Sequence, residues 1–279
     1  SWIDRVRPGD SVVFYFSGHG IADRTGGAVG LLEDIKVNKN LPWAQSFGVT
    51  ELILALRTLA AESAWVFFDA CQDIAAEFAD RLWEVKNIDL KEVSLADLVG
   101  DSCQPLAIAS SRLGQKAWAP DQYESPYFTQ VLLKGLSGCC VEKTKHHGWA
   151  ITGQALLFKL VDVGEAIIDD VVVRPEALSP YSERSVLMAV AAPFTPVAVR
   201  SSPEMHLKLA ATVRVMDGAV ILQSSDAPPF VWRVDVPLEE RFLTVECEVH
   251  QGAVLLAAQT FQQQPPGHII TLIPVGGAA

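Results

Sequence analysis

Two short apolar runs lie in the N-terminal quarter of the chain. Residues 11–16 read Ser-Val-Val-Phe-Tyr-Phe, and residues 64–68 read Ala-Trp-Val-Phe-Phe. Both runs are rich in β-branched and aromatic residues and lack polar alternation, which is typical of strands buried on both faces of a sheet. The pattern therefore predicts two interior strands.

A helix is expected between these strands. Its apolar residues recur at the spacing of one helical face: Leu52, Ala55, Leu56 and Leu59. Thr50 is a suitable N-cap for that helix. A strand-helix-strand crossover normally makes the two strands parallel, so their carboxyl ends are expected at one edge of the sheet.

The alternation continues to about residue 193. The pattern predicts a strand at 105–109, helices at 125–136 and 152–170, and a strand at 185–191. We therefore expect an α/β domain over residues 1–193, with a mostly parallel sheet flanked by helices.

Beyond Pro193 and Pro196 the helical period disappears. Short strand-like stretches follow, at residues 219–222, 230–236, 242–249 and 269–273. This change predicts a small, separate all-β region over residues 194–279.

Composition narrows the class of protein. Hydrophobic residues make up 49% and charged residues 20% of the 279, which suits a folded globular chain. The net charge of -11, without clustered Lys and Arg, disfavours nucleic-acid binding. Five cysteines without a framework spacing, no apolar run of membrane-spanning length and no signal peptide predict a cytoplasmic protein with reduced thiols and no membrane association.

Reactive side chains follow both N-terminal strands. The first is followed by Ser17-Gly18-His19-Gly20, and the second by Asp69-Ala70-Cys71. Catalytic groups gather at the carboxyl ends of parallel strands, where a Cys thiolate can attack and an imidazole can transfer the proton. Alone, Cys71 would be interpreted as a buried apolar residue and His19 as a turn histidine. Together they favour a catalytic pair.

The segments Tyr15–Gly20 and Asp69–Asp73 resemble the histidine and nucleophile motifs of caspases and metacaspases, and the resemblance spans about residues 8–190. It implies a caspase-like cysteine endopeptidase acting on a polypeptide substrate, with no cofactor. By the same resemblance, Cys71 attacks the scissile carbonyl and His19 protonates the leaving group. The backbone N–H groups of Gly20 and Cys71 would bind the oxyanion.

The resemblance also bears on specificity. Asp69 lies two residues before Cys71, as in metacaspases and bacterial relatives that cleave after Arg or Lys, which implies a basic P1 residue. Asp34 and Ser110 are candidate further residues of that substrate pocket. Two departures weaken the match: residues 72–74 replace His-Ser-Gly, and Leu113 replaces an acid.

Regulation is a further expectation of the resemblance. The linker over residues 74–102 carries Arg81, Lys86 and Lys91 as candidate self-processing sites. Caspase-like sheets begin with two strands before the histidine strand, so we expect a missing N-terminal segment or a regulatory protein to complete this one. Bacterial defence or cell death is the role that the family implies.

Other interpretations remain open. Cys139-Cys140 and His146-His147 have the residue types of a zinc site, but adjacent ligands rarely close a tetrahedron, and a loop after a helix fits better. We therefore expect no metal. A catalytically silent caspase-like module could bind partners through its β-rich region. Another thiol hydrolase or acyltransferase on a doubly wound sheet would share the dyad but not the Asp69 pocket.

Overall fold

The computed structural model describes residues 5–23, 26–33, 46–73, 103–120, 124–168, 173–179, 186–201, 210–226, 228–229, 231–239, 241–249 and 258–272. The chain forms two compact units. The first unit comprises Ser1–Leu132, Thr152–Phe158 and Val173–Met188, and the second comprises Leu133–Ile151, Lys159–Val172 and Ala189–Ala279. The sequence predicts a different boundary, after residue 193, between a peptidase domain and a β-rich region. That boundary stays a prediction.

The first unit contains a six-stranded sheet in the order β3-β2-β1-β4-β5-β8. Its strands are β1 (Ser11–Ala22), β2 (Ala28–Leu31), β3 (Ser46–Gly48), β4 (Ser63–Ala70), β5 (Leu106–Ala109) and β8 (Glu176–Ala177). The central strands β1, β4 and β5 are parallel, and β2, β3 and β8 add antiparallel edges. The predicted α/β fold is thus confirmed, with edge strands too short for the apolar pattern to reveal.

Strand β1 is longer than expected. The apolar run ends at Phe16, but the strand continues through Ser17-Gly18-His19-Gly20 to Ala22. The extension is possible because β2 takes over the pairing, with His19 opposite Leu31 and Gly20 opposite Gly30. His19 therefore lies within a strand and not in a turn.

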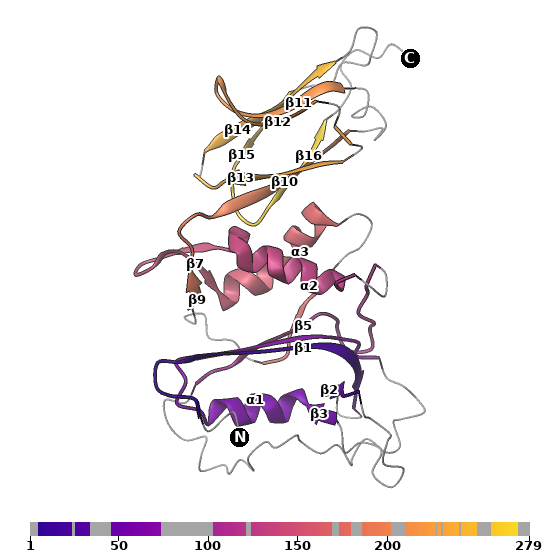
Figure 1. The fold of residues 1–279 in the computed structure, drawn as a ribbon, viewed down its shortest axis with the longest axis vertical. Coiled ribbons are helices and arrows are strands. Elements are labelled where there is room, and N and C mark those ends of the chain that lie inside the picture. The colour runs from indigo at the N-terminus through magenta and orange to yellow at the C-terminus, as the bar shows by residue number, and fades with distance from the viewer. Residues whose placement is uncertain are drawn as a thin grey trace. The chain divides into compact units, whose positions relative to one another are not determined.

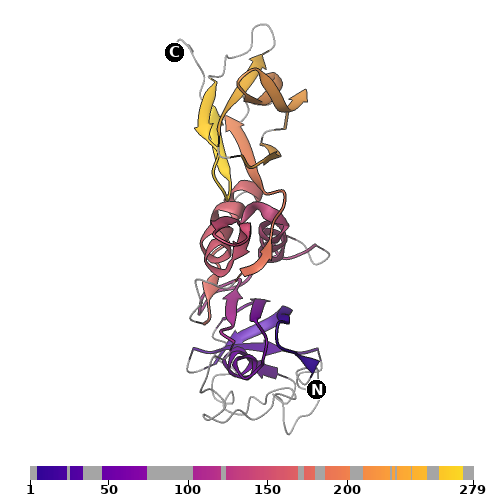
Figure 2. The ribbon, with the colours of Figure 1, turned by 90° about the vertical axis from the view of Figure 1, so that its left-hand side faces the viewer.

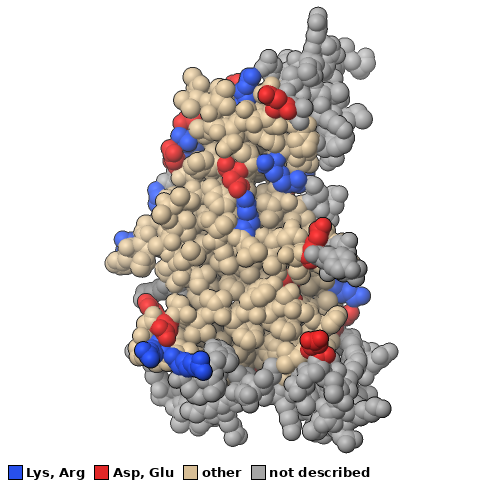
Figure 3. Space-filling model, viewed as in Figure 1, with Lys and Arg blue, Asp and Glu red and all other residues tan. Residues whose placement is uncertain are grey.

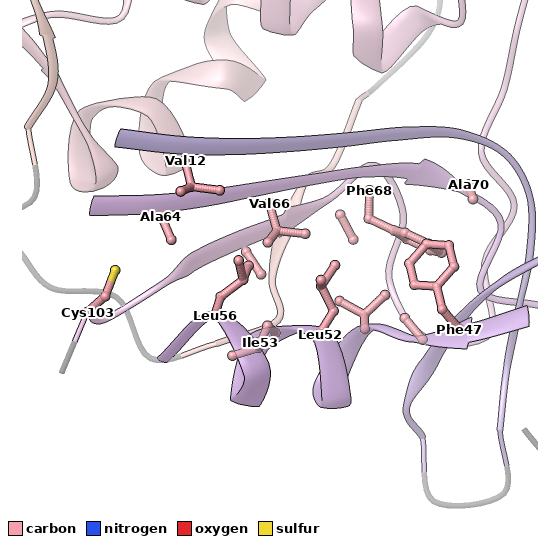
Figure 4. Close-up of a cluster of buried hydrophobic side chains, with 14 of the residues drawn as sticks. Val12, Phe47, Leu52, Ile53, Leu56, Ala64, Val66, Phe68, Ala70 and Cys103 are labelled. Atoms are coloured by element: carbon pink, nitrogen blue, oxygen red, sulfur yellow. The ribbon is translucent and has the colours of Figure 1, made fainter. Parts of the chain in front are cut away.

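One apolar cluster packs helix α1 (Val49–Arg57) against the sheet. Leu52, Ile53 and Leu56 of α1 face Val66 and Phe68 of β4 (Figure 4). The helix lies along one face of the sheet, as Figures 1 and 2 both show. The predicted crossover helix is confirmed, but its N-cap is Gly48 and not Thr50, which lies in the first turn. The packing of α1 fixes β1 and β4 as neighbours.

Two further helices follow the predictions closely. Helix α2 (Tyr127–Lys134) continues into a π-helical turn (Gly135–Cys139), where Gly138 has a φ of 127° and ends the helix. Helix α3 (Gly153–Ile167) follows the hairpin of β6 (Glu142–Thr144) and β7 (Gly148–Thr152). The predicted last strand of the α/β region is β9 (Val186–Ala189).

The C-terminal part of the second unit is all-β, as predicted. One sheet has the order β13-β10-β16 and the other β12-β11-β14-β15. The strands are β10 (Phe194–Ser201), β11 (Ala210–Asp217), β12 (Val220–Asp226), β13 (Trp232–Pro237), β14 (Phe242–Val249), β15 (Gln259–Gln262) and β16 (His268–Leu272). Residues from both sheets, among them Val199, Val215 and Ile270, share one buried core, which makes a sandwich.

Charged side chains are scattered over the face drawn in Figure 3. Lys and Arg lie among Asp and Glu in small groups, separated by wide uncharged areas. The net charge of -11 is therefore not gathered into one acidic surface on this face. Among the described helices, none has the length and apolar character that crossing a membrane requires.

Candidate functional site

The histidine and cysteine motifs meet at the end of two paired strands. In the parallel register of β1 and β4, Ser17 lies opposite Asp69 and Gly18 opposite Ala70. His19 and Cys71 occupy the next position along each chain. The two segments stay side by side, because the Ala22 N–H donates to the Asp73 carbonyl at 3.2 Å.

Gly20 lies directly against the backbone that carries Cys71. A Cβ atom at Gly20 would lie 2.6 Å from the carbonyl oxygen of Cys71 and 2.7 Å from the Cβ of Ala70. Only glycine permits this approach. The requirement for glycine after His19 therefore has a local steric cause.

The Cys71 thiol is free and half-buried, and His19 is exposed. The backbone N–H of Ala117 donates to Cys71 Sγ at 3.4 Å, and the thiol approaches the carbonyl oxygen of Ala117 at 3.9 Å. The segment before Ala117 is also anchored, since the Gln72 N–H donates to Gln115 O at 3.0 Å and the Gly114 N–H donates to Gln72 O at 2.8 Å. Residues 114–117 therefore run beside Cys71.

Gln72 replaces the histidine that metacaspases carry after the nucleophile. Its side chain is 1% exposed, and its Nε2 donates to the carbonyl oxygen of Ser111. The hydroxyl groups of Ser111 and Ser110 donate to the Ala70 carbonyl at 3.0 and 3.3 Å. Gln72 and the two serines thus hold the loop after β5 against the end of β4.

Asp69 is buried on the sheet face opposite α1. Its side chain is 3% exposed, and its Oδ2 accepts a hydrogen bond from the hydroxyl of Thr129 in α2. Tyr15 Oη lies 2.6 Å from the same Thr129 oxygen. Burial raises the pKa of Asp69, and the hydroxyl groups of Thr129 and Ser110 partly oppose that rise. The carboxylate is therefore available for a cationic partner at some cost in desolvation.

The raised pKa predicts how stability depends on pH. Between the ordinary and the raised pKa of Asp69, the native state holds a proton that the unfolded chain has released, so this group destabilises the fold as pH rises. Relative to the wild type, Asp69→Asn is therefore expected to gain free energy of unfolding as the pH rises above the ordinary pKa of an aspartate. Urea denaturation of both proteins at several pH values measures the difference. A difference that does not change with pH would contradict the prediction.

The remaining candidates fall into two groups. Asp34 and the candidate processing sites Arg81, Lys86 and Lys91 lie outside the described residues. Leu113, which replaces a family acid, is 47% exposed, and its N–H donates to Glu176 Oε2 at 3.3 Å. The carboxylate of Glu176 in β8 therefore approaches Leu113, the position at which the family carries an acid. The sequence could not reveal this contact, because 63 residues separate Leu113 from Glu176.

The candidate zinc ligands do not form a metal site. Cys139 and Cys140 are fully buried, and His146 and His147 are exposed in the turn between β6 and β7. Among the residues that the structure describes, no group of three or more His, Cys, Asp or Glu side chains could hold a metal ion. The segment expected to be a loop after a helix forms the hairpin of β6 and β7.

Comparison with known proteins agrees with the motifs. The model of the caspase domain, peptidase family C14, matches residues 3–147, more than half of the 279. An uncharacterized protein of Sinorhizobium fredii (strain NBRC 101917 / NGR234), y4kE, is 29% identical over 154 residues, or 54% of this chain. The chain covers 43% of that relative, less than half of its length. This chain belongs to the caspase domain family.

Proposed function

We propose that the protein is a cysteine endopeptidase that acts through His19 and Cys71. The Cys71 sulfur would bond to the scissile carbonyl carbon, and His19 would give a proton to the departing amine as the peptide bond breaks. Water then hydrolyses the thioester and restores the thiol. The observation that carries this proposal is the parallel register of β1 and β4, in which the two residues follow paired positions.

The oxyanion would bind to the backbone N–H groups of Gly20 and Cys71. The close packing of Gly20 on the Cys71 carbonyl supports this role, since it keeps the two backbone segments next to each other. The thiol of Cys71 is half-buried and the imidazole of His19 is exposed.

We propose a basic P1 residue, held by Asp69, with Ser110 and Asp34 as further candidate residues of the pocket. Asp69 is buried close to the nucleophile, and a buried carboxylate stabilises a cation more than an exposed one does. Hydrolysis of fluorogenic peptides that end in Arg, Lys or Asp tests the proposal. Cleavage after Asp alone would overturn the basic preference, and cleavage that does not require Cys71 would overturn the mechanism.

The resting protein is proposed to need an activator. Residues 114–117 lie where a substrate would approach the thiol, and the Ala117 N–H already donates to Sγ. In addition, one edge of β1 pairs with β4 over Ser11–Gly18, while the opposite edge pairs with β2 only from His19 onward. Among the described strands, none therefore pairs with that opposite edge over Ser11–Gly18. A strand from an N-terminal segment or a regulatory protein would fit that edge, and slower amide exchange over Ser11–Gly18 on its addition would test this.

Ala117→Pro should expose the nucleophile. Proline lacks the N–H that donates to Cys71 Sγ, so the segment loses its hold on the thiol. Alkylation of Cys71 by iodoacetamide is expected to become about tenfold faster, the effect of one lost hydrogen bond. Mass spectrometry of the Cys71 peptide measures the rate.

Ala117→Gly is the matched control, because it keeps the N–H, and it should change the alkylation rate by less than about twofold. An Ala117→Pro rate equal to that of the wild type would show that the segment does not cover the thiol. Both variants are compared at alkaline pH, where access to the thiol limits the rate.

A second candidate function is a catalytically silent module that binds partners through its β-rich region. The observation in its favour is a set of exposed apolar side chains on one sheet of the sandwich: Val220, Ile221 and Phe242. The peptide assay separates the two candidates, since a silent module cleaves nothing. Three further proposals rest on the sequence alone: self-processing between residues 74 and 102, a cytoplasmic location, and a role in defence or cell death. Fragments of the purified protein that form only when Cys71 is intact would support self-processing.

A further inference from the structure

Three side chains from three elements form a polar chain on the sheet face that carries Asp69. Tyr15 comes from β1, Asp69 from β4 and Thr129 from α2. Tyr15 Oη is 2.6 Å from Thr129 Oγ1, and Thr129 Oγ1 bonds to Asp69 Oδ2. Tyr15 is 45% exposed and Asp69 is 3% exposed, so the chain runs from the surface into the interior.

The direction of these hydrogen bonds follows from the donors available. An ionised carboxylate only accepts, so the single hydroxyl proton of Thr129 must point at Asp69 Oδ2. Thr129 Oγ1 can then only accept from Tyr15, which donates its phenolic proton. Tyr15 therefore orients Thr129, and Thr129 orients the carboxylate.

The two carboxylate oxygens of Asp69 differ in their hydrogen bonds. Oδ2 is bonded to Thr129, while Oδ1 is buried and has no hydrogen-bond partner. The Ser110 hydroxyl lies near enough to lower the pKa of Asp69, but it donates its proton to the Ala70 carbonyl at 3.3 Å and so leaves Oδ1 without a donor. A buried carboxylate oxygen without a donor is costly, which favours its use by a ligand.

We propose that Thr129, held by Tyr15, is a positioning residue that makes the Asp69 pocket prefer Lys over Arg at P1. This inference rests on the proposed function, because it assumes that Asp69 binds the P1 side chain. A guanidinium binds a carboxylate best through two parallel hydrogen bonds, one to each oxygen. A lysine ammonium is a compact charge that needs one acceptor, and Oδ1 is the free acceptor.

Thr129 has a second effect in the same direction. Burial raises the pKa of Asp69, and the hydrogen bond from Thr129 opposes that rise. Loss of the hydroxyl would therefore weaken the charge that a lysine needs. Arginine would lose less, because the freed Oδ2 lets its guanidinium bind both oxygens.

The test uses peptidyl chloromethyl ketones that end in Lys or Arg. Cys71 sulfur bonds to the methylene carbon of such a probe and chloride leaves, so labelling reports pocket binding without turnover. The wild type is expected to react about threefold or more faster with the Lys probe than with the Arg probe. Thr129→Val, which keeps the shape and loses the hydroxyl, should lower the Lys rate about tenfold and the Arg rate about threefold or less, so the ratio of the Lys rate to the Arg rate should fall about threefold or more.

Two further variants separate orientation from general damage. Thr129→Ser should retain the lysine preference, and Tyr15→Phe should reduce it partially, because Thr129 keeps its own proton for Asp69. Thr260→Val makes the same chemical change at an exposed position of β15 and should leave both rates unchanged.

The outcomes distinguish the inference from the proposed function. An Arg preference in the wild type, or equal losses for both probes in Thr129→Val, would overturn the inference while labelling at Cys71 leaves the endopeptidase proposal standing. In Ala117→Pro, where residues 114–117 lose their hold on the thiol, reaction of Cys71 with iodoacetamide but with neither ketone would overturn the basic pocket and the inference together.

Discussion

Replacing Cys71 with alanine is expected to abolish peptide hydrolysis. Without the sulfur no acyl-enzyme can form, and removal of a catalytic nucleophile commonly lowers kcat by about 10³-fold or more. The half-buried position of Cys71 means that the substitution removes few packing contacts, so the fold should persist. Hydrolysis of fluorogenic peptides by wild type and variant measures the loss, and circular dichroism checks the fold.

His19→Ala should lower kcat by about 10²- to 10⁴-fold, the usual contribution of a proton-transfer group. Combining it with Cys71→Ala should add little, because the two residues act on the same step. Cys247→Ala is the matched control, since burial raises the pKa of that thiol to about 11 and keeps it protonated. Retained activity in Cys71→Ala would remove this dyad from the mechanism.

Gly20→Ala is expected to damage both the fold and the activity. The added methyl would lie 2.6 Å from the carbonyl oxygen of Cys71, a backbone atom that cannot turn aside as a flexible side chain does. Separating the two strands to relieve this contact should cost about 1–3 kcal/mol of unfolding free energy. A shift of about 1 Å at the nucleophile can lower activity about 100-fold.

Gly18→Ala provides the control for this prediction. It lies on the same strand two residues earlier, and its methyl would meet only the Phe16 ring, at 3.1 Å. We expect a loss of less than about 1 kcal/mol, because an aromatic ring can tilt. Urea denaturation and peptide hydrolysis, both measured well below the melting temperature, compare the two variants. Equal effects from both would rule out the specific contact with Cys71.

Much of the fold followed from the apolar pattern. The run at 64–68 is continuous because β4 is buried on both faces, whereas β1 leaves Val13 and Tyr15 exposed on one face, so its predicted burial on both faces was wrong. Helix α1 lies where the helical period placed it. Strands β2, β3 and β8 were missed because two to four residues carry no readable period. Pairing with a neighbour, and not local propensity, makes such segments strands.

Part of the candidate site was predictable for the same reason. His19 and Cys71 each directly follow, or extend, a strand with a strong signal, and the parallel crossover rule brings such ends together. Ala117 could not be predicted, because its contribution is a backbone N–H that any residue except proline supplies. Thr129 could not be predicted either, since it meets Asp69 across 60 residues of sequence.

The sequence by itself determined the family, the order of the central elements and the two residues proposed for catalysis. These depend on local properties: apolar runs, helical spacing and reactive side chains in short motifs. Only the tertiary structure decided that Gly20 packs on the Cys71 backbone, that residues 114–117 lie beside the thiol, and that Thr129 occupies one oxygen of Asp69. These contacts join distant segments, and their geometry is set by how α2 and the loop after β5 pack on the sheet.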